Sequence, residues 1–388
     1  MVLPQRLKVL HVVDSLELGG LERVVTDLAI AQRDVEEGVA VFSISDTGGH
    51  RDTLEAAGIR VIQGGKRRTA DLGVLRRLRR AVHELDADIV HAHNFVPNYY
   101  AAAALLAIGR RPALVTTCHD MGFRLSDRKL RTLFRLSLSR TARVAMVGRQ
   151  VHRRFVDAGT VDPSMTTVIL NGVDTARFNG GDLRRQAARR ALQLPPEALV
   201  VGAVGRLVAL KNHAALVAAM PALLAAFPQL VLVLAGDGPL HDSLESQARA
   251  LGIAGQVRFL GARGDIAAIL PAFDVFALPS LTEGLSIALL EAAACGLAIV
   301  ASKVGGNPEI IADGVRGLLV APGDAEALRE CLRQMLGDAS LRQRFGDAAR
   351  AWVHANCSIA AVCRTYHDCY RDALRSSGGR PAPADLPA

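Results

Sequence analysis

The chain has 388 residues, of which 50% are hydrophobic and 22% are charged, a globular composition that leaves room for two ordinary domains and excludes disordered or collagen-like chains. Aromatic residues make up only 4%, which argues against a platform for stacking single-stranded nucleic acid. The net charge of +8 is uneven: residues 1–178 carry 26 Lys and Arg against 19 Asp and Glu, and residues 179–388 carry 20 against 19. The first half is therefore expected to face an anionic partner.

In the first half, short apolar β-rich runs alternate with amphipathic helical stretches. Strands that are apolar throughout are buried on both faces, as in a parallel sheet that is covered by helices. The expected strands are 7–13, 39–44, 60–62, 88–93, 113–118 and 143–148, with helices that include 21–33, 71–85 and 124–139.

The second half repeats the alternation after a polar, Gly- and Pro-punctuated segment at 179–197. Strands are expected at 199–205, 230–236, 257–261, 275–279 and 298–302, followed by helical stretches at 324–355 and 358–375. We therefore predict an α/β protein of two doubly wound, Rossmann-like domains that face a cleft. The predicted domains are 1–178 and 179–357, followed by a helix at 358–375 and a disordered tail at 376–388.

Three features bear on location and partners. The apolar run at the N-terminus is too short for a signal peptide, and the six cysteines include no C-x-x-C pair. Both features favour free thiols in a reducing cytoplasm. Because no nucleic-acid recognition motif accompanies the basic charge, nucleic acid is not expected as a partner.

The segment TEGLSIALLEAAACG (282–296) carries the strongest chemical signal. Glu283 and Glu291 lie a little over two helical turns apart, so both carboxylates are expected on roughly the same side. The backbone N–H groups of Gly284 and Leu285, where the helix starts, could receive a phosphate. Apolar neighbours on both sides predict that Glu291 is buried, and a buried carboxylate needs a partner.

The carboxyl ends of other strands in this half also carry polar or glycine-rich loops. Arg206 and Lys211 follow the strand 199–205, where two cations could neutralise a diphosphate leaving group. Asp237 and Gly238 follow the next strand, and a Gly-Gly pair follows the strand 298–302. Because these loops meet at one sheet edge, we predict a ligand site there.

The first half offers fewer candidates. Gly20 closes a Gly-Gly turn at the start of a helix, where an anion can bind, although a plain turn explains it as well. His119 ends a strand at the carboxyl edge. His91 and His93 share one face of their strand, but no third ligand has suitable spacing, and the D-x-D at 86–88 precedes its strand and so lies at the wrong edge. No metal is therefore expected.

Taken together, these motifs resemble those of the retaining family 4 glycosyltransferases, which have the GT-B fold. The resemblance covers nearly the whole chain, and its looser sub-pattern is that of bacterial enzymes of exopolysaccharide or lipid-linked glycan assembly. It rests on LELGGLERVVTDLA, DIVHAHN, VILNGVDTARF, VGRLVALKN, VLAGDGPL, VRFLG, PSLTEGLSIALLEAAACG and VGGNPEII, in the family's order.

The resemblance implies roles for residues of the second half in binding a nucleotide-sugar donor, a UDP- or GDP-sugar. Arg206 and Lys211 would hold the diphosphate, and Glu291 would bind the ribose hydroxyls. Glu283 would contact the transferred sugar with help from the amides around Gly284 and Leu285. The glycine turn at Gly238 and the pair Leu260 and Gly261, near the nucleobase, would complete the donor site.

For the first half, the resemblance implies that His119 sits beside the sugar and that Gly20 approaches the phosphate. The helix 358–375 would cross back to the first domain. Substitution would take place on the same face of the sugar, with no cofactor or metal, because the cations and the helix N-terminus stabilise the leaving group. The acceptor would be a glycan or a lipid-linked glycan.

Two other classes remain open. A nucleotide-sugar epimerase or phosphorylase on the same architecture would need no separate acceptor. A non-catalytic sugar-binding protein is disfavoured by the cation pair and by the absence of a recognisable signal peptide.

The basic charge of the first half is concentrated in two segments. Residues 66–80 hold seven Lys and Arg with one acid, and residues 122–154 hold ten with one. A helix at 124–140 would be basic on one side and apolar on the other, which suits an anionic membrane surface or, equally, a core-packed helix with a solvated face. We expect an enzyme that docks peripherally on the inner membrane face.

Overall fold

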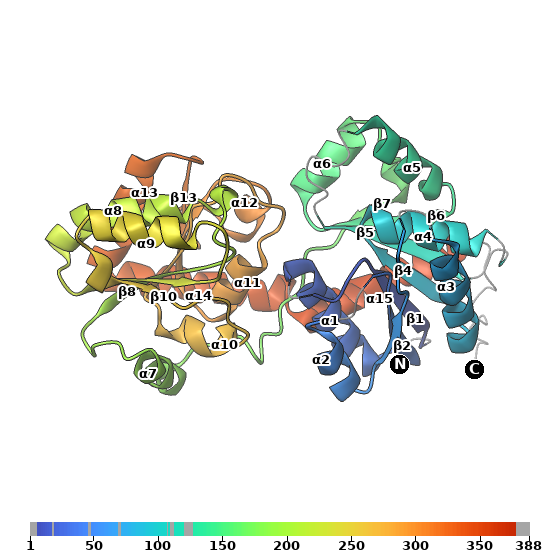
Figure 1. Ribbon diagram of the computed structural model, residues 1–388, viewed down its shortest axis with the longest axis horizontal. Coiled ribbons are helices and arrows are strands. Elements are labelled where there is room, and N and C mark those ends of the chain that lie inside the picture. Colours follow the sequence, from blue (N-terminus) through green and yellow to red (C-terminus); the bar gives the residue numbers. More distant parts are fainter. Residues whose placement is uncertain are drawn as a thin grey trace, which may run out of the picture. The chain divides into compact units, whose positions relative to one another are not determined.

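The computed structural model describes residues 6–17, 19–45, 48–68, 71–106, 108, 112–119 and 127–377. The chain forms two compact units, both drawn in Figure 1. The first unit is Met1–Gly172 with Ile359–Ala388, and the second unit is Val173–Ser358. The division therefore falls at Gly172 rather than at the expected Phe178, because Val173 pairs with Ser358 of the second unit.

The first unit is built on a parallel sheet with the order β3-β2-β1-β4-β5-β6-β7 in the described part of the chain. Its middle strands are buried along their whole length, which explains their continuously apolar sequences. The strands are β1 Lys8–Val13, β2 Gly38–Ser43, β3 Arg60–Gln63, β4 Ile89–His93, β5 Ala113–Cys118, β6 Thr141–Met146 and β7 Thr166–Val168.

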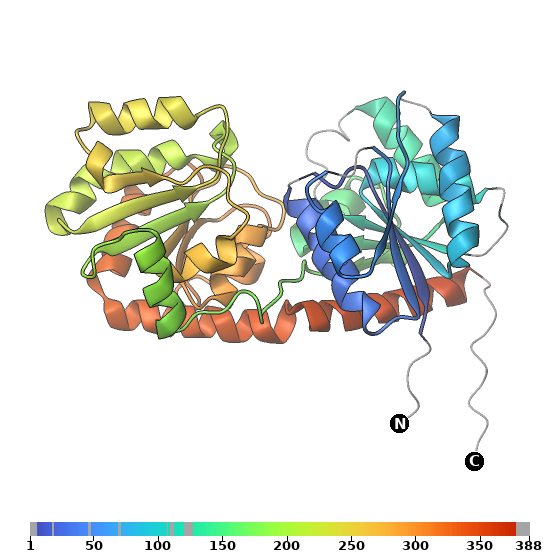
Figure 2. The same ribbon diagram turned by 60° about the horizontal axis from the view of Figure 1, so that its bottom comes forward.

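Helices cover both faces of this sheet. On one face α1, α2 and α15 pack together, and α15, the dark red helix of Figure 2, lies against β5 and β6. On the other face α3 packs against α4, and α4 contacts α5. The helices are α1 Gly20–Arg33, α2 Arg51–Ala56, α3 Leu72–Leu85, α4 Phe95–Leu105, α5 Arg128–Leu138, α6 Arg149–Asp157 and α15 Ile359–Ser376.

The second unit has a parallel sheet with the order β10-β9-β8-β11-β12-β13 among the described residues. Helices α8, α9 and α13 lie on one face, and α7, α10, α11 and α14 lie on the other (Figure 1). The strands are β8 Leu199–Val204, β9 Leu230–Ala235, β10 Val257–Phe259, β11 Val275–Leu278, β12 Ala298–Ser302 and β13 Leu318–Val320. The helices are α7 Asp182–Ala191, α8 His213–Ala226, α9 His241–Ala250, α10 Ile266–Ile269, α11 Ile287–Ala294, α12 Asn307–Ile310, α13 Ala325–Gly337 and α14 Ala339–Asn356.

The predicted fold class of two doubly wound α/β domains is confirmed. The sequence patterns did not single out the helices α4, α6 and α9 or the short strands β7 and β13. The stretch expected to be helical at 324–355 is two helices, because the Asp338 carboxylate caps the N-terminus of α14 by accepting from the amide of Leu341. Of the tail expected at 376–388, Ser376 ends α15, and residues 378–388 lie outside the described residues. In the described ranges, no helix is both long and apolar enough to cross a bilayer.

Candidate functional site

The topology of the second unit places a switch point between β8 and β11. The chain leaves β8 toward β9 on one side and later returns to β11 on the other. In such sheets the loops at the carboxyl ends of the two central strands diverge and leave a crevice where ligands bind. The loops in question are 205–212 after β8 and 279–286 after β11.

Three contacts tie these two loops together. The Leu281 amide donates a 2.8 Å hydrogen bond to the Leu210 carbonyl. The Asn212 side-chain amide donates a 3.3 Å bond to the Pro279 carbonyl. The Lys211 Nζ then lies 2.6 Å from Glu283 Oε1, an ion pair across the switch point.

Glu283 is held firmly. Its Oε1 accepts from both Lys211 and the Ser280 hydroxyl, each at 2.6 Å, and its side chain is only 9% exposed. The sequence motifs predict that Lys211 and Glu283 both belong to the site, but they do not predict the ion pair between them.

Arg206 is exposed at the same edge, and no described side chain pairs with its guanidinium. It follows Gly205, whose φ of +155° favours glycine. A Cβ on Gly236 would come within 1.9 Å of the Gly205 carbonyl oxygen, and one on Gly238 within 2.6 Å of the Leu207 carbonyl oxygen. These glycines let the loops after β8 and β9 pack backbone against backbone.

The same edge extends to the loop after β10. Gly261 accepts a 2.8 Å hydrogen bond from the Gly236 amide, and Leu260 donates 2.9 Å to the Leu234 carbonyl. The structure thus brings Gly238, Leu260 and Gly261 to neighbouring loops.

Gly284 and Leu285 lie against the loop after β12. The Gly306 amide donates a 2.6 Å bond to the Gly284 carbonyl, and a Cβ on Gly305 would be 2.1 Å from the Glu283 carbonyl oxygen. Gly305 has a φ of +56°, so the Gly-Gly pair is required for this close approach.

Glu291 is buried on α11, 8% exposed, as its apolar neighbours predicted. It lies one turn before Cys295, and its charge adds to burial in raising the Cys295 pKa to about 12. The N-cap of α11 is Ser286, whose hydroxyl accepts from the Leu289 amide at 3.3 Å.

In the first unit, His119 follows β5 and is 8% exposed. Its amide donates a 2.9 Å bond to the side-chain oxygen of Asn94, which ties the loops after β4 and β5 together. Its ring Nε2 lies 3.1 Å from His93 Nδ1, so the ring faces inward on that side. Burial lowers the His119 pKa to about 4, which keeps the imidazole neutral at ordinary pH.

Gly20 is the first residue of α1, as predicted, but a carboxylate is already present at this helix end. The Glu22 Oε2 lies 2.2 Å from the place that a Cβ on Gly19 would take. Burial, together with the charges of Glu17 and Asp14, raises the Glu22 pKa. An approaching phosphate would first have to displace the Glu22 side chain.

The spacing of residues along the sequence indicates no third ligand beside His91 and His93, but in the structure a third histidine lies next to them. His11 is the register partner of His91 on the neighbouring strand β1, and ring nitrogens of the three residues lie within 4.8 Å of one another. All six ring nitrogens nevertheless have hydrogen-bond partners, namely Gln32, Tyr370, Thr117, His119 and, between His11 and His93, each other. A metal could bind only by breaking these bonds.

The D-x-D segment lies at the amino end of the strands, as expected. Asp88 accepts a 3.0 Å bond from the Lys8 amide, and Asp86 pairs with the Lys8 side chain at 3.3 Å. Both aspartates thus have structural partners away from the carboxyl edge.

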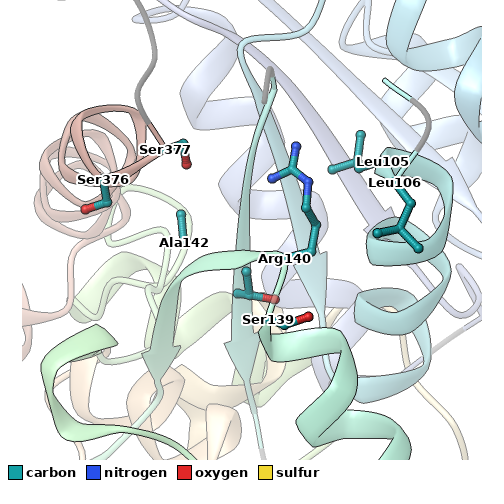
Figure 3. A pocket seen from close by; sticks show the side chains of 8 residues that line it. Leu105, Leu106, Ser139, Arg140, Ala142, Ser376 and Ser377 are labelled. Carbon is teal, nitrogen blue, oxygen red and sulfur yellow. The ribbon is translucent and has the colours of Figure 1, made fainter. Parts of the chain in front are cut away.

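A cavity of about 510 Å³ opens in the first unit (Figure 3). It lies beside the start of β6 and the ends of α4, α5 and α15, so it belongs to the amino edge of the sheet. Its lining residues are Leu105, Leu106, Ser139, Arg140, Thr141, Ala142, Ser376 and Ser377. Its position separates it from the carboxyl-edge residues described above.

Two family models match the chain, Glycosyltransferase Family 4 over residues 18–177 and Glycosyl transferases group 1 over residues 184–352. The chain is 33% identical over 304 residues to the GDP-mannose-dependent alpha-(1-6)-phosphatidylinositol monomannoside mannosyltransferase of Mycolicibacterium smegmatis, covering 73% of this chain and 76% of that protein. It is 39% identical over 228 residues to the D-inositol 3-phosphate glycosyltransferase of Actinosynnema mirum, and it spans about half the length of that relative, 54% of each chain.

Solved structures also resemble it. Anabaena Alr3699/HepE in complex with UDP superposes with a TM-score of 0.82 at 24% identity, covering 93% of this chain and 98% of that one. Sucrose-phosphate synthase from Thermosynechococcus elongatus superposes with a TM-score of 0.78 at 20% identity, covering 95% of this chain and 100% of that one. At these identities the likeness concerns the fold.

Proposed function

The chain belongs to the family 4 and group 1 glycosyltransferases and has the GT-B fold, and from this premise we propose that it is a retaining enzyme that transfers a sugar from a UDP- or GDP-sugar to a glycan or lipid-linked acceptor. The HepE structures contain UDP or UDP-glucose, and the M. smegmatis relative is named for GDP-mannose, which supports both bases as candidates. The wider role would be exopolysaccharide or cell-envelope glycan synthesis.

The observation that carries the proposal is the Lys211–Glu283 ion pair at the switch point, beside the exposed Arg206. The pair holds a cation in place at the edge where the ligand binds, and Arg206 adds a second cation with no competing side chain among the described residues. Two cations at this edge suit a diphosphate, whose charge grows as it leaves the sugar.

The hydrogen bonding of Glu283 supports substitution on one face of the sugar. A double displacement needs a carboxylate that is free to attack the anomeric carbon. Here Oε1 accepts two hydrogen bonds, one of them from the Lys211 ammonium, and the side chain is 9% exposed, so the carboxylate is a weaker nucleophile than an unpaired one. We therefore assign Glu283 to holding Lys211 and contacting the transferred sugar.

In the proposed reaction the bond between the anomeric carbon and the diphosphate oxygen breaks while the acceptor oxygen bonds to the same face. The acceptor proton passes to the leaving diphosphate, and Arg206 and Lys211 stabilise the charge that remains. These cations take the electrostatic role that a metal plays in other transferases, so we propose that neither metal nor cofactor is needed.

The remaining site residues are proposed in the roles that the family resemblance implies. In the second unit, Glu291 binds the ribose, the amides of Gly284 and Leu285 assist Glu283, and the neighbouring loops of Gly238, Leu260 and Gly261 receive the rest of the nucleotide. In the first unit, His119 contacts the sugar and Gly20 the phosphate.

The test is a screen of UDP-, GDP- and ADP-sugars, first without and then with candidate acceptors, with products followed by mass spectrometry and the anomeric configuration by NMR. We expect slow donor hydrolysis for one nucleotide and a product of retained configuration once an acceptor is present. Epimerised or phosphorolysed donor without acceptor would instead assign the epimerase or phosphorylase class.

We also propose that the enzyme docks on an anionic membrane from its cytoplasmic side through α5. Phe134 and Leu138 are buried, but Leu133 and Leu136 are 48% and 66% exposed on a helix that also carries exposed bases. Exposed leucines among bases are what an interfacial helix requires. The six cysteines are all free thiols, which supports a reducing compartment.

A further inference from the structure

A continuous row of hydrogen bonds runs through the core of the first unit from helix α1 to the loop after β5. The His11 Nε2 lies 2.7 Å from the side-chain oxygen of Gln32, and His11 Nδ1 lies 3.0 Å from His93 Nε2. The His93 Nδ1 lies 3.1 Å from Nε2 of His119. Gln32, His11 and His93 are at most 1% exposed, so water cannot replace these partners.

Each imidazole in this row is neutral, because burial lowers the pKa of His11 to about 4 and holds that of His93 well below its ordinary value. A neutral imidazole has one N–H donor and one acceptor nitrogen. In a row of such rings, the direction of one hydrogen bond therefore decides the direction of all the others.

Gln32 sets that direction. Its amide nitrogen donates a 3.1 Å hydrogen bond to the Tyr370 hydroxyl, so its oxygen faces His11 and can only accept. His11 must then carry its proton on Nε2 and accept at Nδ1 from His93 Nε2–H. His93 in turn accepts at Nδ1 from His119, which requires the His119 proton to be on Nε2.

The same amide directs a second row. Tyr370, having accepted from Gln32, donates its own proton to His91 Nδ1 at 2.8 Å. His91 Nε2 then donates to the Thr117 hydroxyl at 2.7 Å, and Thr117 bonds to the Tyr366 hydroxyl at 3.0 Å. With this orientation of the Gln32 amide both rows are fully paired, and turning the amide over would reverse the direction of both rows together.

We propose that Gln32 is a positioning residue that fixes His119 as the tautomer protonated at Nε2, acting through His11 and His93. The lone pair of His119 is thereby placed on Nδ1. The His119 ring also has a side-chain hydrogen bond with Asn171, which raises its pKa, so Asn171 competes with Gln32 in setting the tautomer. On the proposed function, which this consequence rests on, His119 accepts a hydrogen bond from a sugar hydroxyl and does not donate one. Gln32 touches no substrate and acts only through the two intervening rings.

The test reads the tautomer directly, by ¹⁵N NMR of imidazole nitrogens in histidine-labelled full-length protein at neutral pH, with His119 assigned by its loss in His119→Asn. In the wild type we expect the proton of His119 on Nε2. In Gln32→Leu we expect a mixture of both tautomers. Gln32→Glu, which keeps an acceptor facing His11, should retain the wild-type His119 signal.

The matched control is Thr117→Val, an equally buried and nearly isosteric change that interrupts only the second row. It should alter His91 and leave His119 unchanged. Where the donor screen has identified a substrate, kcat/KM should fall about tenfold in Gln32→Leu, which is the effect of losing roughly one hydrogen bond. In Thr117→Val it should stay near the wild-type value.

A wild-type spectrum with the His119 proton on Nδ1, or an unchanged His119 signal in Gln32→Leu, would overturn the proposal. If Gln32→Leu does not fold, Gln32→Met takes its place, because it also removes the acceptor that faces His11 but keeps the length of the side chain, and it should give the same mixture of tautomers. Because the spectra need no substrate, failure of every donor to react would count against the proposed function and not against the role of Gln32.

Discussion

The side-chain nitrogen of Gln32 donates a 3.1 Å hydrogen bond to the Tyr370 hydroxyl, although the two residues are 338 positions apart. Gln32 lies near the end of α1, and Tyr370 lies on α15, the helix that returns to the first unit after the second is complete. One face of α15 is buried against the sheet, at Val362, Cys363, Tyr366, Cys369, Tyr370 and Ala373. The core of the first unit is therefore completed by the C-terminal end of the described chain.

The buried histidines predict that the first unit loses stability in mild acid. His11 and His119 keep pKa values of about 4 in the folded state, and His91 and His93 lie well below their ordinary values, whereas unfolded histidines bind protons near pH 6.5. The unfolded state thus binds more protons below about pH 6.5, and the free energy of unfolding should fall by up to about 1.4 kcal/mol per pH unit for each histidine as pH drops toward 4.

Urea unfolding followed by circular dichroism between about pH 7.5 and about pH 4.5 measures this effect. The single tryptophan, Trp352, lies in the second unit and gives an internal reference by fluorescence. In that unit His213 is a buried histidine with a pKa of about 4. Equal acid sensitivity of the two units would contradict the prediction.

We expect Lys211→Ala and Glu291→Ala each to reduce turnover about a hundredfold or more, which corresponds to about 2.7 kcal/mol of transition-state stabilisation. Lys211→Ala removes a cation that Glu283 holds at the site, and Glu291→Ala removes the proposed ribose contact. Steady-state kinetics on the donor from the screen measures both. Arg344→Ala, at an exposed position of α14, is the control for the loss of a surface charge. Near-wild-type rates in both site variants would show that the active site does not lie here.

Arg206→Lys should also impair the enzyme, although it preserves the charge. An ammonium group cannot reproduce the two parallel hydrogen bonds that a guanidinium makes to phosphate oxygens. Donor KM and kcat should therefore show a loss, with Arg344→Lys as the matched exchange elsewhere in the second unit. A fully active Arg206→Lys enzyme would mean that Arg206 acts through its charge alone.

Donor turnover should survive removal of divalent metals with EDTA. Arg206 and Lys211 supply positive charge at the carboxyl edge, and the ring nitrogens of His11, His91 and His93 are all engaged in hydrogen bonds. The measurement is the rate after chelation and dialysis, followed by metal addition. Complete loss of activity that Mg²⁺ or Mn²⁺ restores would rule out a mechanism based on the cation pair alone.

Binding to anionic liposomes should depend on α5. Each base near such a surface contributes about 1 kcal/mol, so reversing Arg128, Lys129 and Arg131 to Glu should weaken binding by more than about a hundredfold. Binding should also fall steeply as NaCl rises, because salt screens these charges. Cosedimentation measures the affinity.

The control for this experiment reverses Arg329, Arg333 and Arg344 to Glu in the second unit, which changes the net charge equally. A protein that ignores anionic liposomes even at low salt, or two triple variants that behave alike, would show that α5 is not a docking helix.

The local pattern of the sequence was sufficient for most of the strands and for much of the edge that carries the site. Apolar runs predict buried strands because a strand in a parallel sheet is covered on both faces, and β1, β4, β9 and β12 lie where such runs occur. The loops with Arg206, Lys211 and Glu283 could be placed at one edge because successive parallel strands all end on the same side. Glu291 could be predicted as buried from its immediate neighbours alone.

Which residues of the site pair with one another was decided only by the tertiary structure. Lys211 and Glu283 are 72 positions apart, and their pairing depends on β11 lying beside β8 rather than beside β9. His11 was missed because a histidine within an apolar strand has no local signature, and it joins His91 only through the register of β1 against β4. Strand order and register arise from long-range packing of whole elements, so a pattern read along the chain carries no record of which side chains meet across the sheet.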